Sequence, residues 1–140
     1  HAFSGFERVL DRLDDERGNM MPAGGGTNTP AGLIVHCCEL APSWFETPGL
    51  GRDTVRDRAA EFATRASVAA LRARIAATVE RCDLLAEELA VGPTAVDHPF
   101  RAFLPGGDLS DAALVLHVLE ELYQHLGHLE VTADALCAGA

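Results

Sequence analysis

Apolar residues recur at helical spacing along four segments of the chain, and no segment alternates apolar and polar residues as a strand would. The first segment carries one apolar face and ends before Pro22 and the glycines at 24–26. The second begins at Asn28-Thr29-Pro30, where a capping residue precedes a proline in the first helical position. The stripes of these two segments consist of Phe3, Phe6, Val9, Leu10 and Leu13, and of Leu33, Cys37, Leu40 and Trp44.

The third and fourth segments are the longest. The third begins near Ser67, continues to about Ala90 and has apolar residues at three- and four-residue steps. The fourth runs from residues 108–110 to about Cys137 and is apolar around most of its circumference, so we expect it to be the most buried helix. We therefore predict an all-α fold and a single domain over residues 1–140.

Two long connections separate these helices. Residues 46–66 join the second helix to the third, and residues 91–108 join the third to the fourth. A connection as long as the first permits a crossover, so the second and third helices need not be antiparallel neighbours. The charged stretch 52–62 within it is expected to form a short helix.

Charge and composition exclude several classes of function. The chain has 11 basic and 21 acidic residues and a net charge of −10, so it repels phosphate backbones and nucleic acid is not an expected partner. We expect no association with membranes, because no apolar run approaches the ~18 residues of a membrane-spanning helix and no secretion signal is visible. The four cysteines form no C-x-x-C pair and are expected to be free thiols in a reducing, cytoplasmic compartment.

The chemically informative residues lie in the fourth helix. At about 100° per residue, His117, Glu121, His125 and His128 share a stripe roughly 80° wide beside the apolar face, whereas Glu120 points to solvent. A carboxylate next to apolar neighbours needs compensation, and a Glu and a His four residues apart can bind one metal ion together. The third ligand must then come from another helix, where His36 lies at the edge of the buried stripe.

Spacing alone leaves other readings open. A single helical histidine is usually a structural, hydrogen-bonded residue, and geometry does not decide which of the histidines would be ligands. His117, Tyr123 and His128 are candidates for residues that support the ligands. Three arginines at 52, 56 and 58 could meet carboxylates of a bound thiol cofactor, but we expect them to pair locally with the neighbouring Asp53 and Asp57.

Three sequence motifs resemble those of the DinB-like superfamily, in particular its actinobacterial branch of mycothiol-dependent enzymes. They read LIVHCC at 33–38, GRDTVRDRAAEF at 51–62 and LHVLEELYQHLGH at 116–128. The resemblance implies a four-helix bundle with a long crossover between the second and third helices. It also implies that His36, Glu121 and His125 are metal ligands, as in the maleylpyruvate isomerases of that branch, which have Glu where most relatives have a third His. The absence of lysine and the abundance of Ala, Gly, Val and Leu are typical of a GC-rich bacterial genome, which agrees with such a source.

The function implied by the resemblance is that of a metal-dependent S-transferase. Two His and one Glu leave coordination positions open and suit Zn²⁺, although Fe²⁺ or Ni²⁺ also accept this set. The cation would hold mycothiol as a metal-bound thiolate, which attacks a small electrophile. Because the sequence ends soon after the fourth helix, we expect no second domain like that of the maleylpyruvate isomerases, and their specific activity is therefore less expected here. The alternatives are a zinc-dependent hydrolase that uses the same site, an iron site for oxygen chemistry, and a non-enzymatic, stress-related metal-binding protein whose metal stabilises a homodimer.

Overall fold

The computed structural model of the chain describes residues 1–23, 27–91 and 110–138, and helices are its regular elements. Within these residues the structure contains no strand, so the predicted all-α class is confirmed. None of the helices there is long and apolar enough to cross a membrane. In chain order the elements are α1 (Ala2–Leu10), α2 (Asp15–Gly18), α3 (Pro30–Trp44), the π-helix η1 (Phe45–Gly49), α4 (Arg58–Ala63), α5 (Val68–Val91) and α6 (Asp111–Ala138).

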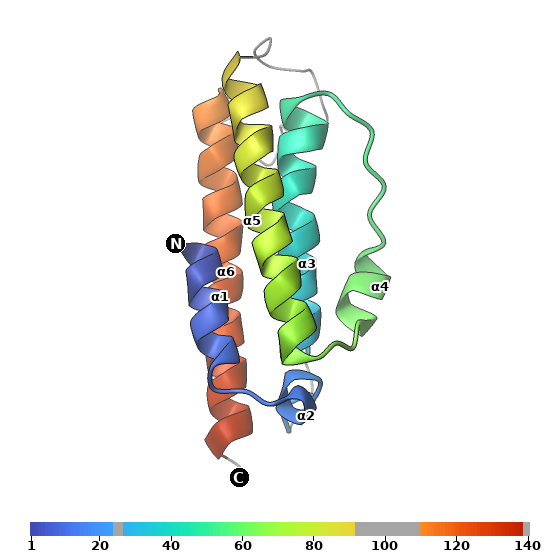
Figure 1. Cartoon of the computed structure of the whole chain (residues 1–140), viewed down its shortest axis with the longest axis vertical. Coiled ribbons are helices and arrows are strands. Elements are labelled where there is room, and N and C mark those ends of the chain that lie inside the picture. The colour runs from blue at the N-terminus through green and yellow to red at the C-terminus, as the bar shows by residue number, and fades with distance from the viewer. Residues whose placement is uncertain (24–26, 92–109, 139–140) are drawn as a thin grey trace.

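The helices α1, α3, α5 and α6 lie lengthwise around a shared apolar core (Figure 1). After α3 the chain returns along the outside of the bundle to the short helix α4 and only then enters α5 (Figure 1). As a result α3 and α5 run in the same direction and pack against each other, while α1 and α6 run the opposite way. The predicted crossover is therefore confirmed, and the predicted short helix is α4, which occupies the second half of the stretch 52–62.

Local hydrogen bonds explain where the long helices begin. The Thr29 side chain accepts a hydrogen bond from the Gly32 amide, and Pro30 occupies the first helical turn of α3, where a missing N–H costs nothing. Ser67 and Ser110 play the same part before α5 and α6, since their hydroxyls accept from the amides of Ala70 and Ala113. These starts agree with the sequence predictions.

Two expectations about the helices are wrong. The first segment ends before Pro22 as predicted, but it is not one helix through Leu13, because α1 ends at Leu10 and a separate turn, α2, is capped by Asp14. The most buried helix is α3 and not α6, whose Leu116 and Val131 are largely exposed. The reason is the position of α3, which contacts α4, α5 and α6 and is covered on several sides.

The end of α3 departs from regular helix geometry. Pro42 lies inside the helix and has no amide to donate, and the chain then widens into η1, where the amide of Leu50 donates to the carbonyl of Phe45 at 2.9 Å. Wide turns of this kind are frequent at functional sites. Here η1 supplies Thr47 and Pro48 to the wall of a cavity described below.

Candidate metal centre

His36 lies in the middle of α3 and is completely enclosed. Its exposed fraction is 1%, so it does not sit at the edge of a buried stripe as the sequence suggested. The covering element is α4, whose Phe62 ring stacks on the imidazole with the ring centroids 4.5 Å apart. A histidine in such a place must have its polar atoms satisfied by protein groups or by a ligand.

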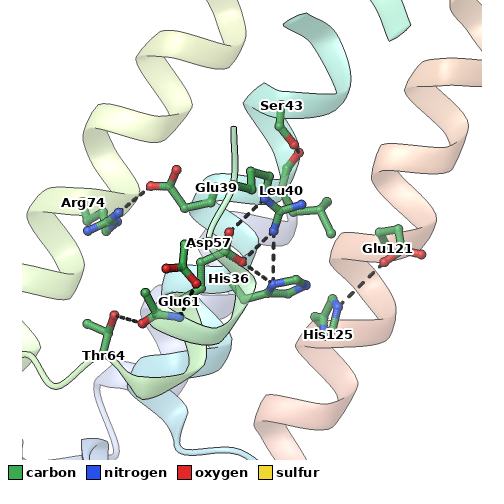
Figure 2. A network of polar contacts seen from close by, with 12 residues as sticks. His36, Glu39, Leu40, Ser43, Asp57, Glu61, Thr64, Arg74, Glu121 and His125 are labelled. Atoms are coloured by element: carbon green, nitrogen blue, oxygen red, sulfur yellow. Dashed lines mark hydrogen bonds and ion pairs between the residues drawn. The ribbon is translucent and has the colours of Figure 1, made fainter. Parts of the chain in front are cut away.

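Glu61 of α4 is the partner of His36, and sequence reasoning did not identify it. Its carboxylate, only 5% exposed, lies 2.7 Å from Nδ1 of His36 through Oε2 (Figure 2). Arg56 donates to the same carboxylate, from Nε to Oε1 at 2.9 Å and from Nη2 to Oε2 at 2.7 Å. Burial raises the pKa of Glu61, but the hydrogen bonds from Arg56 and His36 outweigh it and hold the pKa below its ordinary value. Glu61 is therefore an anion at neutral pH.

Gly32, one turn before His36, lets α4 approach α3 closely enough for this contact. A β-carbon at position 32 would lie 2.7 Å from the carbonyl oxygen of Phe62 and 3.1 Å from its α-carbon. Both contacts are with backbone, which cannot rotate away. The glycine is thus a condition for the packing that brings Glu61 to the imidazole.

The hydrogen bonds fix the tautomer of His36. A carboxylate only accepts, so Nδ1 must carry the proton that it donates to Glu61, and the approach of Arg56 Nη2 to Nδ1 at 3.2 Å is then a close contact between two donors. The lone pair accordingly resides on Nε2. Among the described residues, Nε2 of His36 is the one buried side-chain nitrogen or oxygen without a hydrogen-bond partner. Leaving such an acceptor empty costs about 1–3 kcal/mol, whereas a metal ion bound there would satisfy it.

Two further candidate ligands face His36 from α6. The ring of His125 lies edge-on to that of His36, with centroids 4.8 Å apart, and Nε2 of His125 is 3.8 Å from Oε2 of Glu121 (Figure 2). In the described residues no three His, Cys, Asp or Glu side chains are close enough together to hold an ion as they stand. Glu121 and His125 are 31% and 19% exposed at their side chains, so neither is fully enclosed by packing. The donor set fits a divalent cation chemically, and the ligand assignment stays a prediction.

Both histidines are suited to be neutral at physiological pH. Burial lowers the pKa of His36 and outweighs the hydrogen bond to Glu61, and burial likewise lowers the pKa of His125 despite the nearby charge of Glu121. A neutral imidazole offers a lone pair, which a metal ion requires. The protons need not be displaced before a cation binds at pH 7.

The other predicted residues have different surroundings. His117 is buried on α6 and packs edge-on against Trp44 at 4.3 Å between centroids. His128 lies 2.6 Å from the hydroxyl of Thr27 through Nε2, and Tyr123 is half exposed. Glu120 is exposed, as predicted, and accepts a hydrogen bond from Gln124. Among the described residues, Glu61 is the carboxylate that accepts a hydrogen bond from His36, which is the role expected of a group that supports a metal ligand.

The arginines of the crossover do not pair with Asp53 and Asp57 as expected. Arg56 pairs with Glu61, and Arg52 pairs with a carboxylate of α5, Glu88. The Arg58 guanidinium lies over the ring of Phe62, 5.7 Å from its centroid. Asp57 instead caps α4 by accepting from the amide of Ala60. These pairs form because of the way the crossover lies against the bundle. Neighbouring positions in the sequence do not reveal that arrangement.

A cavity of about 470 Å³ lies between α3, η1, the crossover and α6, and Glu121 forms part of its wall. The apolar part of the wall includes Leu40, Trp44 and Pro48. Arg56, Arg58 and His117 also line it. A small molecule in this cavity would therefore lie beside one of the three candidate ligands.

The sequence profile of a protein family described as the DinB superfamily matches residues 2–129, which includes every helix that builds the candidate centre. No curated protein and no solved structure matches the chain.

Proposed function

This chain belongs to the DinB superfamily, and on that premise we propose that it is a metal-dependent enzyme that joins a low-molecular-weight thiol to a small electrophile. In this proposal His36, Glu121 and His125 hold one divalent cation, with Zn²⁺ as the leading candidate and Fe²⁺ or Ni²⁺ as alternatives. The thiol is mycothiol, following the resemblance of the three motifs to the mycothiol-dependent branch.

The observation that carries the proposal is the empty lone pair of His36. Nε2 is buried without a partner, while Nδ1 is held by an anionic carboxylate. A carboxylate that receives the second N–H of a histidine is the usual support for a metal-bound imidazole, because it fixes the tautomer and makes the ring a stronger donor. A purely structural histidine gives no reason for an acceptor that is buried and left unsatisfied.

The chain's own residues divide the remaining work. When bound, a divalent cation with open positions lowers the pKa of a thiol that reaches it, so that the thiolate is available at neutral pH. Glu61 and Arg56 hold His36 in one orientation, and Phe62 covers the imidazole and excludes water from it. In the overall reaction the sulfur–carbon bond replaces the S–H bond of the thiol. The pair of the S–H bond stays on sulfur and forms the new bond to carbon. In a substitution, the bond from that carbon to the displaced group breaks, its electron pair leaves with that group, and the thiol's proton is released. In an addition to an activated double bond, the π electron pair takes up a proton at the neighbouring carbon.

The protein's own thiols are poorly suited to this role. Cys37 and Cys38 are buried, and burial raises the pKa of Cys37 far above its ordinary value and that of Cys38 to about 11. Burial also raises the pKa of Cys82 to about 12. At neutral pH these groups remain protonated, and a thiol is a much weaker nucleophile than a thiolate. The fourth cysteine, Cys137, lies near the end of α6 against the carbonyl of Arg12. These observations support a nucleophile that is a separate thiol.

The test is conjugate formation from mycothiol and a panel of electrophiles by metal-loaded protein, with each product identified by mass spectrometry. We expect turnover that requires both metal and thiol and is lost in Glu121→Gln but kept in the neighbouring control Glu120→Gln. Product formation without thiol would instead support the hydrolase. Metal binding without turnover of any electrophile would support the non-enzymatic alternative.

A further inference from the structure

The cavity beside Glu121 combines an apolar wall with two cationic side chains, Arg56 and Arg58. Of its two arginines, Arg56 is held by Glu61 through two hydrogen bonds, so its charge is already compensated. Arg58 forms no ion pair within the part of the chain that the structure describes, and its recorded contact is with the face of Phe62. What distinguishes Arg58 from other arginines without a carboxylate partner, such as the exposed Arg65, is that it lines the cavity, where it can bind an anionic group of a ligand.

The position of Arg58 connects the cavity to the candidate metal centre. Arg58 packs over Phe62, and Phe62 stacks on His36. Arg58 also lines the same cavity as Glu121, a second candidate ligand. An anionic group bound by Arg58 would thus hold the rest of its molecule next to the three ligands.

The charges of the site favour an anion once a metal is present. Glu121 faces the cavity and repels anions in the metal-free protein. A divalent cation held by Glu121 and two neutral histidines reverses that sign, because two positive charges meet one negative charge. Arg58 adds a further positive charge at the same cavity.

We propose that this cavity binds the electrophilic substrate and that the substrate is a small, flat organic carboxylate, whose carboxylate is bound by Arg58 and whose apolar body lies against Trp44. The proposal rests on the S-transferase function for the identity of the bound molecule as the acceptor. The wall supports a flat body, since Leu40, Trp44 and Pro48 provide apolar surface on α3 and η1. A guanidinium suits a carboxylate because its parallel N–H groups match the two oxygens.

The chain contains a single tryptophan, Trp44, so its fluorescence reports directly on the cavity. The probe is benzoate, an unreactive flat carboxylate, and its matched neutral analogue is benzamide. We expect benzoate to change the Trp44 emission and to bind roughly tenfold or more tightly than benzamide, in line with the strength of hydrogen bonds to charged groups. Loading with Zn²⁺ should tighten benzoate binding and leave benzamide binding nearly unchanged.

Variants of Arg58 test the assignment in both the metal-free and the metal-loaded protein. Arg58→Gln should weaken benzoate binding roughly 10- to 100-fold and leave benzamide binding unchanged. Arg58→Lys should restore part of the affinity. The control is Arg65→Gln, an exposed arginine that does not line the cavity, and it should bind benzoate like the wild type. Circular dichroism and thermal melting of each variant show that it is folded.

Three results would overturn the inference: no binding of benzoate at millimolar concentration, equal binding of benzoate and benzamide, or an Arg58→Gln variant that binds benzoate normally. The outcome is separable from that of the proposed function. Arg58-dependent benzoate binding without any thiol conjugation would refute the S-transferase and keep the carboxylate site. Metal-dependent conjugation that ignores the charge of the electrophile would refute the carboxylate site alone.

Discussion

Replacement of Glu61 by Gln tests whether α4 supports the candidate metal centre. The side chains have the same shape, but glutamine has one accepting oxygen and no charge. If its oxygen takes the place of Oε2, it still accepts hydrogen bonds from His36 and from Arg56 Nη2, but without the negative charge of the carboxylate. Its NH₂ group then faces Arg56 Nε, so that two donors oppose each other.

The expected loss of stability follows from these contacts. One hydrogen bond between charged groups, of about 1.5–3 kcal/mol, disappears and two others lose their charge assistance. Arg56 is 24% exposed at its side chain and regains some hydration, which reduces the loss. We expect the free energy of unfolding to fall by about 2–3 kcal/mol in Glu61→Gln. The affinity for Zn²⁺ should fall roughly 10- to 100-fold, because the imidazole is no longer fixed and polarised by an anion.

Glu39→Gln is the matched control. Like Glu61, Glu39 pairs with an arginine, Arg74. Unlike the buried Glu61, the side chains of Glu39 and Arg74 are 37% and 44% exposed. Exposed pairs contribute ~0–1 kcal/mol, so this variant should be nearly as stable as the wild type and bind Zn²⁺ equally well. Stability is measured by urea unfolding followed by far-ultraviolet circular dichroism, and affinity by competition with a coloured chelator. If Glu61→Gln matches Glu39→Gln in both measurements, the reasoning about the support of His36 is wrong.

Two further predictions concern packing and protonation. Gly32→Ala should destabilise the protein by about 1–3 kcal/mol, because the added methyl group meets the backbone of Phe62. Gly127→Ala should stabilise α6 by about 0.5–1 kcal/mol, because a β-carbon there has nothing within 4 Å. Equal effects of the two variants in thermal melting would contradict the packing argument. The metal-free protein should lose stability as the pH falls below 6.5, because the folded pKa values of His36 and His125 are lowered and the unfolded chain therefore takes up protons first. Urea unfolding at pH 7.5, 6.5 and 5.5 should show this decline, with a smaller slope in His36→Asn; identical slopes in the two proteins would rule out a contribution from His36.

Local signals in the sequence were sufficient to predict most of the framework. Capping residues such as Thr29 and Ser67 act within one turn, so the first residues of α3 and α5 could be predicted from the sequence immediately around them. The length of the connection after α3 permitted a crossover, and the resemblance to the DinB-like superfamily implied one. The burial of α3 could not be predicted in the same way, since it depends on how many other helices surround it.

The support of the site was beyond the reach of spacing. His125 and Glu121 were proposed together because one helix fixes their separation, and the structure does place their side chains 3.8 Å apart. Glu61 lies 25 positions from His36, and only the docking of α4 on Gly32 brings the two together. The buried, unsatisfied Nε2 atom likewise becomes visible only once every neighbouring donor has been placed.

The most direct test of the central claim is the metal content of protein purified without added ions and then equilibrated with Zn²⁺. We predict one ion per chain in the wild type and in the adjacent-position controls Glu120→Ala and His128→Ala, and little or none in His36→Ala, Glu121→Ala and His125→Ala. Full metal content in the last three variants, or equal loss in the controls, would contradict a centre built from α3 and α6.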